Sequence, residues 1–222
     1  MNVLAIETST DACSVALVTN DIVTEDHRVL VRGHHRELLP MIETLLGNSG
    51  VPPRTLTGVV LSAGPGSFTG LRIGASVAQG LAFAAECPIA PVSSLHVLAY
   101  GVVSPIDDSL VLATQPARPG EVYVGVYRWR NRTWLIERDD RTLAIEDAAR
   151  ELGNVGLAHV AGRGAGVLAA AIGASAQVSE IELPRAAHAL ELGLPVLADG
   201  RGVDAGHPEL MYVSDTSAWR KA

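Results

Sequence analysis

Aromatic and charged residues are both scarce in this chain of 222 residues, at 4% and 18% of the composition. Hydrophobic residues make up 48%, so a substantial core is available and long disorder is not expected. Few aromatics together with abundant Ala and Gly predict closely packed helices and sheets. The length allows one large domain or two small ones.

Cysteine is also rare. Cys13 and Cys87 stand alone, without CxxC or Cys/His spacing, and we expect two reduced, buried thiols in a cytoplasmic protein. The N-terminus has no basic segment followed by an apolar one, so no signal peptide is expected. No run reaches the roughly 18 apolar residues of a membrane span, and no membrane contact is predicted.

Positive charge is in short supply. The net charge is −7 and the pI is near 5.4. Strong independent binding to nucleic acid requires phosphate-neutralising Lys and Arg, so this balance argues against it. A role beside a basic partner remains open.

The first half of the chain reads as strands and helices in alternation. Strands are predicted at 2–7, 13–19, 22–31, 58–62 and 89–92, and helices at 36–46, 69–86 and from Ser93 or Ser94 to about 102. The 36–46 helix carries a wide apolar arc, and Pro40 fits only near its start.

The segment 104–109 is the best linker, and it divides the chain into lobes 1–104 and 105–222. Beyond it we predict strands at 110–114, 122–129, 133–136 and 157–161, helices at 145–152 and 164–172, a helix from Pro184 to about Ala198, and a last strand at 210–213. Both halves give the order βββαβα. This predicts an α/β fold of two ribonuclease-H-like lobes, the arrangement of the actin and sugar-kinase class, each a mixed sheet with flanking helices.

The most distinctive stretch is the Gly-rich loop 61–72, between a strand and a helix. Such loops can present N–H groups to an anion, or they can be plain turns in which Gly64 and Gly66 take unusual φ/ψ angles and Ser67 or Thr69 caps the helix. Spacing alone favours the plain turn. The loop is neither a P-loop nor a dinucleotide fingerprint.

Other catalytic patterns are weak. The seven histidines include no His-Glu-x-x-His and no i, i+4 pair, so no metal site is predicted. No Gly-x-Ser-x-Gly occurs. The hairpin 127–134 interleaves Arg with Trp as a small nucleic-acid platform would, yet an apolar face toward the core and a solvated Arg face explain it better.

A site for phosphoryl transfer must also be considered, because proteins of the predicted architecture often bind ATP. Residues 7–10 offer a carboxylate and hydroxyls, as such a site requires. The corresponding turn 114–120 has no acid, and Pro116 and Pro119 remove two N–H donors. The turn 162–166 could approach a nucleotide or join a strand to a helix. We therefore do not expect the chain to hydrolyse ATP alone.

Together, these residues resemble the TsaB family, the non-catalytic members of the bacterial machinery for threonylcarbamoyladenosine in tRNA. The matching stretches are 4–10, 13–17, 35–42, 64–74, 78–82 and 92–95, with weaker ones at 117–123 and 211–215. Two departures are Glu7, where the family tends to have Asp, and Pro116, where it has an acid. The second makes a bound nucleotide still less expected.

The resemblance implies an actin-like fold without catalysis, cofactor or metal of its own. It implies a TsaD-type catalytic subunit and a TsaE-type ATPase as partners, which supply ATP and metal, with tRNA reached through the complex. Residues of the subunit interface, with a TsaD-type partner or in a homodimer, are then His35, Leu38, Leu39, Ile42 and Leu46. A vestigial nucleotide or partner contact would use Glu7, Thr8, Ser9, Gly64, Gly66, Ser67, Thr69, Gly70 and Arg72.

Two rival functions remain at this point. An actin-like ATPase or small-molecule kinase is suggested by residues 7–10 and the two Gly-rich turns. A peptidase acting on the partner is the other, because members of the family have been classed with peptidases, although no residue is nominated for it.

Overall fold

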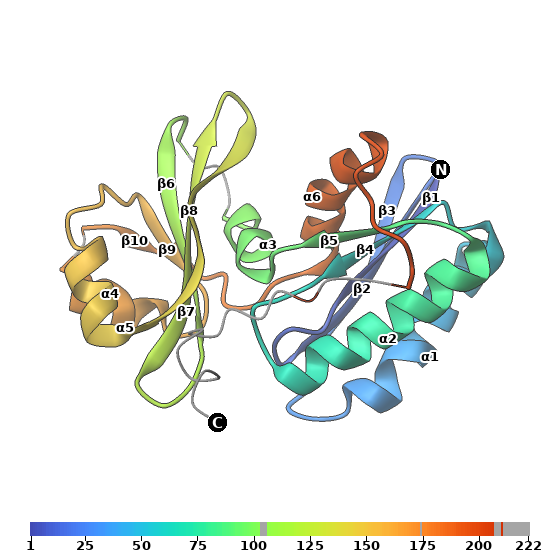
Figure 1. The fold of residues 1–222 in the computed structure, drawn as a ribbon, viewed down its shortest axis with the longest axis horizontal. Coiled ribbons are helices and arrows are strands. Elements are labelled where there is room, and N and C mark those ends of the chain that lie inside the picture. Colours follow the sequence, from blue (N-terminus) through green and yellow to red (C-terminus); the bar gives the residue numbers. More distant parts are fainter. Residues whose placement is uncertain (103–105, 174, 207–209, 211–222) are drawn as a thin grey trace. The chain divides into compact units, whose positions relative to one another are not determined.

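The fold consists of two α/β units (Figure 1). The computed structural model describes residues 1–102, 106–173, 175–206 and 210. One unit contains Met1–Val97 and the segment that begins at Pro184, and the other contains Leu98–Leu183. Each holds a five-stranded mixed sheet with flanking helices, which confirms the predicted fold class.

The sheet of the first unit has the order β3-β2-β1-β4-β5. Its strands are β1 (Asn2–Glu7), β2 (Ala12–Thr19), β3 (Ile22–Val29), β4 (Gly58–Ser62) and β5 (Ile89–Val92). Strands β1, β2 and β3 pair antiparallel, whereas β1, β4 and β5 pair parallel. The helices are α1 (His34–Asn48), α2 (Phe68–Ala85), α6 (Ala186–Ala198) and the short 3-10 helix η1 (Pro53–Thr55), and α3 (Ser94–Tyr100) spans the division between the units.

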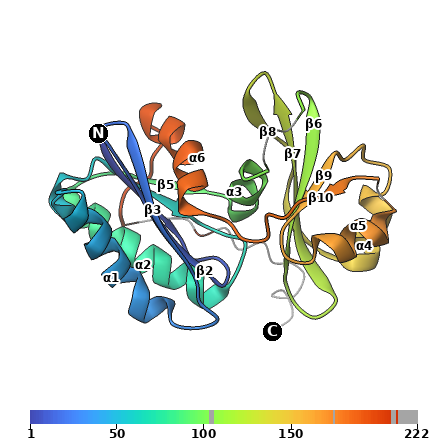
Figure 2. The same cartoon turned by 180° about the vertical axis from the view of Figure 1, so that it is seen from behind.

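Helices cover both faces of this first sheet. Helices α1 and α2 pack side by side on one face and α6 packs on the other (Figures 1 and 2). Alternation along β1 explains the two layers, because successive side chains of a strand point to opposite faces. Leu4 and Ile6 join the core under α1 and α2, while Val3 and Ala5 join the core under α6.

The second unit repeats this topology, with the sheet order β10-β9-β6-β7-β8. Its elements are β6 (Ser109–Pro116), β7 (Glu121–Arg130), β8 (Thr133–Ala144), α4 (Ile145–Leu152), β9 (His159–Ala161), α5 (Ala165–Ile172) and β10 (Gln177–Val178). Strands β6, β7 and β8 pair antiparallel and β6, β9 and β10 pair parallel, as their counterparts do in the first unit.

Four elements differ from the predictions. Helix α1 begins at His34, so Pro40 is its seventh residue and lies inside the helix rather than near its start. Strand β8 runs eight residues beyond the predicted 133–136, and β10 was not predicted. Helix α6 does not join the second lobe, because Ala186, Ala189 and Leu190 are buried in the core of the first unit. The strand predicted at 210–213 lies outside the described residues, apart from Leu210. Within the described ranges, no helix combines the length and apolar character needed to span a membrane.

Candidate functional site

The Gly-rich loop packs directly on the turn that follows β1. The structure brings together all nine residues predicted for a nucleotide or partner contact, since β1 and β4 are parallel neighbours. Five of them are buried, namely Glu7, Thr8, Ser9, Gly64 and Gly70, and Gly66 is half-buried. The exposed members are Ser67, Thr69 and Arg72. The nine residues thus form an interior contact with a small exposed edge.

Close approach explains most of the glycines. A Cβ at Gly66 would lie 2.2 Å from the carbonyl oxygen of Ser9, and one at Gly70 would lie 2.1 Å from that of Thr8. A Cβ at Gly74 would lie 2.3 Å from the Thr8 hydroxyl. Only Gly64 has an unusual backbone, with a φ of 112°; Gly66 does not, contrary to the prediction. Space, rather than dihedral freedom, requires glycine at these three positions.

The amides of the loop are engaged within the unit. Ser67 N–H donates to the carbonyl of Ser9 at 2.6 Å, and Gly64 N–H donates to the Ser94 hydroxyl at 3.1 Å. Gly70 N–H donates to the Ser67 hydroxyl at 3.3 Å, which makes Ser67 the N-cap of α2. The Thr8 hydroxyl donates to the carbonyl of Gly70 at 2.9 Å. These three N–H groups are therefore not directed at an anion, which supports a structural role for this part of the loop.

Glu7 is a fully buried carboxyl group at the end of β1. Loss of solvation raises the pKa of Glu7 to about 7, although hydrogen bonds from Ser62 and Ser9 act in the opposite direction. The Ser9 N–H donates to Glu7 Oε1 at 2.5 Å. Burial therefore favours the protonated form of this carboxyl over the ionised form.

The predicted interface residues of α1 divide into two sets. Leu38, Ile42 and Leu46 are buried in the core under the first sheet, so their side chains are not available to a partner in this conformation, contrary to the prediction. Leu39 is 49% exposed and His35 is exposed. The apolar arc of α1 belongs mainly to its own unit.

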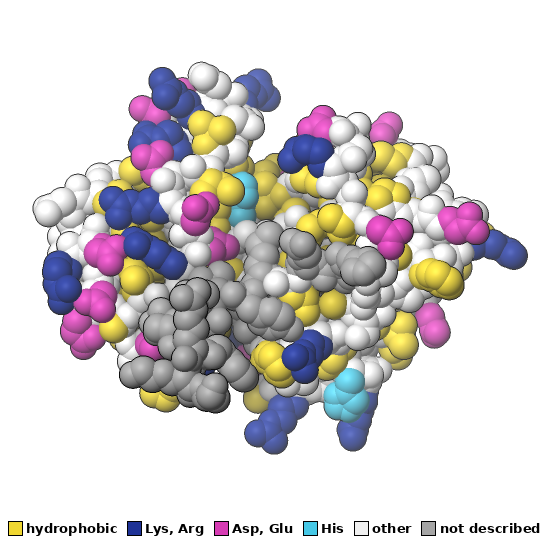
Figure 3. Space-filling view, in the orientation of Figure 1, with side chains coloured by type: hydrophobic (Ala, Val, Ile, Leu, Met, Phe, Trp, Pro, Cys, Tyr) yellow, Lys and Arg dark blue, Asp and Glu magenta, His cyan; other side chains and the backbone are white. Residues whose placement is uncertain are grey.

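Sequence reasoning missed the exposed apolar residues of α2. Phe68 is 56% exposed and Phe83 is 80% exposed, and the Arg72 guanidinium lies 3.8 Å above the Phe68 ring. On a helical wheel Phe68, Arg72 and Phe83 fall within about 60°. Hydrophobic, basic and histidine side chains are exposed together over the beginnings of α1 and α2 (Figure 3). Phe83 lies on the same side of α2 but about 22 Å farther along the helix. We call the exposed side of the two helices that carries His35, Leu39, Phe68, Arg72 and Phe83 the α1/α2 surface.

A second polar cluster, which no local motif signals, fixes the start of α6. Glu25 on β3 accepts hydrogen bonds from the Ala187 N–H at 3.0 Å, the Ser14 hydroxyl at 2.9 Å and Arg185 at 2.6 Å. These bonds outweigh desolvation and hold the pKa of Glu25 below its usual value. The partners are up to 162 residues apart in sequence, so only the fold brings them together.

The other residues considered as possible sites in the sequence are mostly paired with neighbours or buried. Arg128 in the hairpin pairs with Glu137 and Asp108 at 2.9 Å each, and these carboxylates weaken the positive field of the hairpin. His34 is buried with its ring at 3.1 Å from the carbonyl of Ala12, apart from the exposed His35.

Cys13 and Cys87 are free and buried, as predicted. Among the described residues, no three His, Cys, Asp or Glu side chains group to hold a metal ion.

Comparisons with known proteins identify the family of this chain. The family model described as "TsaD: tRNA N6-adenosine threonylcarbamoyltransferase" matches residues 24–207. The tRNA threonylcarbamoyladenosine biosynthesis protein TsaB of Escherichia coli is 34% identical over the whole chain and 98% of its own length, and that of Haemophilus influenzae is 33% identical over the whole chain and 97% of its own length. A Pseudomonas aeruginosa structure described as similar to peptidase YEAZ superposes with a TM-score of 0.84 at 32% identity, covering 96% of this chain and 99% of that one. The chain therefore belongs to the TsaD family and, within it, to the TsaB group.

Proposed function

We propose that this chain is a non-catalytic accessory subunit in the biosynthesis of threonylcarbamoyladenosine in tRNA. The observation that carries the proposal is the full-length similarity to TsaB proteins named for that pathway. The geometry of the loop agrees with it, because Glu7 is buried and the N–H groups of Gly64, Ser67 and Gly70 donate hydrogen bonds within the unit. Catalytic groups, ATP and metal come from the partners.

The partner in this proposal is a TsaD-type catalytic subunit bound at the α1/α2 surface. Large exposed apolar side chains rimmed by polar groups mark interaction sites, and Leu39, Phe68 and Phe83 are 49%, 56% and 80% exposed. Arg72 over Phe68 adds an aromatic and arginine pair of the kind enriched at interfaces. The interface replaces the one predicted from Leu38, Ile42 and Leu46, while His35 and Leu39 remain in it.

The other partners follow from the same role. A TsaE-type ATPase joins the assembly, and tRNA is reached through the complex, because a net charge of −7 disfavours direct contact with phosphates. Without its partner the chain pairs with a second copy through the same surface. The assembly works in the cytoplasm.

Co-purification with a TsaD-type subunit tests the pairing. The double variant Leu39→Glu, Phe83→Glu should weaken the complex at least tenfold, since it places two carboxylates in an apolar contact. Ile22→Glu is the matched control, because Ile22 is 63% exposed on β3, outside the α1/α2 surface. A complex that resists the double variant, or a wild-type chain that forms none, would contradict the proposal.

The two rival functions are tested on the isolated chain. An ATPase or kinase predicts micromolar binding of Mg-ATP in calorimetry together with turnover. A peptidase predicts time-dependent cleavage of the purified partner that a single substitution abolishes. Neither signal is expected here.

A further inference from the structure

Strand β3 forms an open edge of the first sheet. It pairs with β2 over eight residues without a register shift, and among the described residues no strand pairs with its other side. Exposed apolar side chains lie at both ends of the strand, where Ile22 is 63% and Val29 is 59% exposed. An unpaired edge presents a row of N–H and C=O groups to other chains, so proteins usually shorten, bend or cover it.

The other three sheet edges carry such protection. At the opposite side of the first sheet, β5 has four residues, and Ile89 exchanges backbone hydrogen bonds of 2.9 and 2.7 Å with Val203. In the second sheet, β10 has two residues, and β8 pairs with β7 through register shifts between Val124 and Tyr127. Such bulges disrupt the ladder and protect an edge. Within the described part of the chain, β3 is thus the long, regular edge without a cover.

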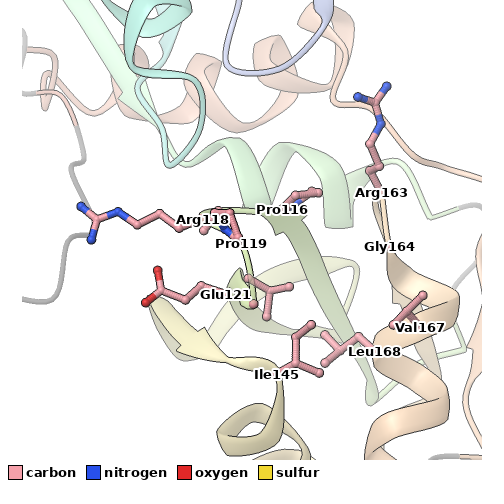
Figure 4. Close-up of a pocket in the computed structure, with 12 residues that line it drawn as sticks. Pro116, Arg118, Pro119, Glu121, Ile145, Arg163, Gly164, Val167 and Leu168 are labelled. Atoms are coloured by element: carbon pink, nitrogen blue, oxygen red, sulfur yellow. The ribbon is translucent and has the colours of Figure 1, made fainter.

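The pocket of the second unit is a different kind of feature. It has a volume of about 480 Å³ and lies between the β6–β7 turn and the starts of α4 and α5 (Figure 4). Strands β6 and β7 pair with neighbours on both sides, so the pocket offers a hollow for side chains but no free strand edge.

The turn before β3 determines which backbone groups of the strand face outward. Asn20 and Asp21 connect β2 to β3, and both have a positive φ, as a two-residue hairpin turn requires. Thr19 and Ile22 flank this turn and are therefore a hydrogen-bonded pair, and such pairs recur at every second residue of the ladder. The outward N–H and C=O groups belong to the residues between them, namely Val23, Glu25, His27 and Val29.

We propose that a second copy of this chain pairs with this edge, β3 antiparallel to β3, so that the two five-stranded sheets become one. One register places all four outward residues inside the contact. Val23 then faces Val29 of the second copy. Glu25 likewise faces His27 of the second copy, and the two-fold symmetry repeats both pairs. A shift of two residues in either direction would place Val23 or Val29 opposite a residue outside β3.

The side chains are complementary in the same register. The exposed Val23 and Val29 form an apolar pair at each end of the contact. At the centre Asp26 faces Asp26 of the second copy. Arg28, which bonds Asp26 of its own copy at 2.7 Å, is a diagonal neighbour of the other Asp26, within reach of a long side chain. The two aspartates are thus accompanied by two arginines, and this self-complementarity selects a second copy as the occupant.

A cysteine at position 26 tests both the contact and its register. The two Asp26 Cα atoms would form a non-hydrogen-bonded pair about 4.5 Å apart, a separation that a disulfide can bridge. Asp26→Cys should therefore give a covalent dimer on mild oxidation of the full chain, whereas the buried Cys13 and Cys87 should not react. The matched control is Thr24→Cys on the same face of β3, because its two copies would lie about 14 Å apart.

Light scattering separates this contact from the α1/α2 surface, and the result does not depend on the function proposed above. In the Leu39→Glu, Phe83→Glu background, the chain should still have twice its mass of 23.2 kDa at high micromolar concentration. Val29→Lys should weaken this dimer about tenfold, because it places a charge opposite Val23 at both ends of the contact. Val167→Lys, at a valine 66% exposed in the other unit, should change nothing.

Three results would overturn the proposal. One is a monomer in the Leu39→Glu, Phe83→Glu background, as expected if the β3 edge instead binds a different protein. The second is equal cross-linking of the Asp26→Cys and Thr24→Cys chains, which would show collisions rather than one register. The third is a dimer that Val29→Lys leaves unchanged.

Discussion

The contact between Gly70 and the turn after β1 yields a sharp prediction about stability. In the Gly70→Ala variant the new Cβ would lie 2.1 Å from the Thr8 carbonyl oxygen, whereas real Cβ atoms stay beyond 3.0 Å. The loop must move by about 1 Å, which costs roughly 1–3 kcal/mol as overpacking. Weakening of the Thr8 hydroxyl bond to Gly70 adds about 1 kcal/mol, and the better helix propensity of Ala returns about 1 kcal/mol. We expect a net loss of about 2 kcal/mol.

The same helix supplies the control. Gly80 is exposed, and a Cβ there meets nothing within 4 Å, so Gly80→Ala should gain about 0.5–1 kcal/mol from helix propensity alone. Thermal unfolding followed by circular dichroism should lower the Tm of Gly70→Ala by about 4–8 °C and raise that of Gly80→Ala by about 2 °C. A Gly70→Ala chain as stable as the wild type would refute the packing role assigned to the loop.

Three further predictions concern buried and half-buried groups. Because the folded pKa of Glu7 is raised to about 7, ionisation of Glu7 destabilises the fold as the pH rises toward and past 7. In urea unfolding, the stability of Glu7→Gln relative to the wild type should therefore increase by about 2 kcal/mol between pH 5 and pH 8. A stability difference between the two proteins that does not change with pH would disprove this. Ile42→Ala should cost about 3 kcal/mol in the same assay, whereas Leu39→Ala should stay within about 0.5 kcal/mol; equal losses would contradict the burial of the one and the exposure of the other. Glu25→Ala should cost about 2 kcal/mol and speed amide exchange in α6. Since the folded pKa of Glu25 is lowered, the stabilisation is present at neutral pH and is lost in the wild type as the pH falls through that pKa; unchanged exchange in α6 would argue against its role.

The sequence predicts most elements of this fold, because period and turn chemistry are local. Strands β1, β4 and β5 have the predicted bounds. Strand β8 was underestimated because Glu137–Arg141 carries charges on consecutive residues, and these are accommodated on the outermost strand of the sheet. Strand β10 has only two residues, too few for any period to be visible.

The packing of α1 and of α6 depends on which surface the apolar face of each helix contacts, and the local sequence does not determine that surface. The spacing of apolar residues places Leu38 and Ile42 on one face of α1. That spacing is the same whether the face packs on the protein's own sheet or on a partner protein. The sheet on which α6 packs is likewise set by distant residues such as Val60. The loop glycines were found from sequence, but their reason, the approach to Thr8 and Ser9, is visible only in three dimensions.

Reconstitution of tRNA modification tests the central claim most directly. A TsaD-type subunit, a TsaE-type ATPase, ATP, tRNA and a source of the threonylcarbamoyl group would be combined with and without this chain, and threonylcarbamoyladenosine would be measured by mass spectrometry. The account predicts modification only when the chain is present, loss of at least tenfold with Leu39→Glu, Phe83→Glu, and no ATP turnover by the chain alone. Full modification in its absence, or ATP turnover by the isolated chain, would contradict the account.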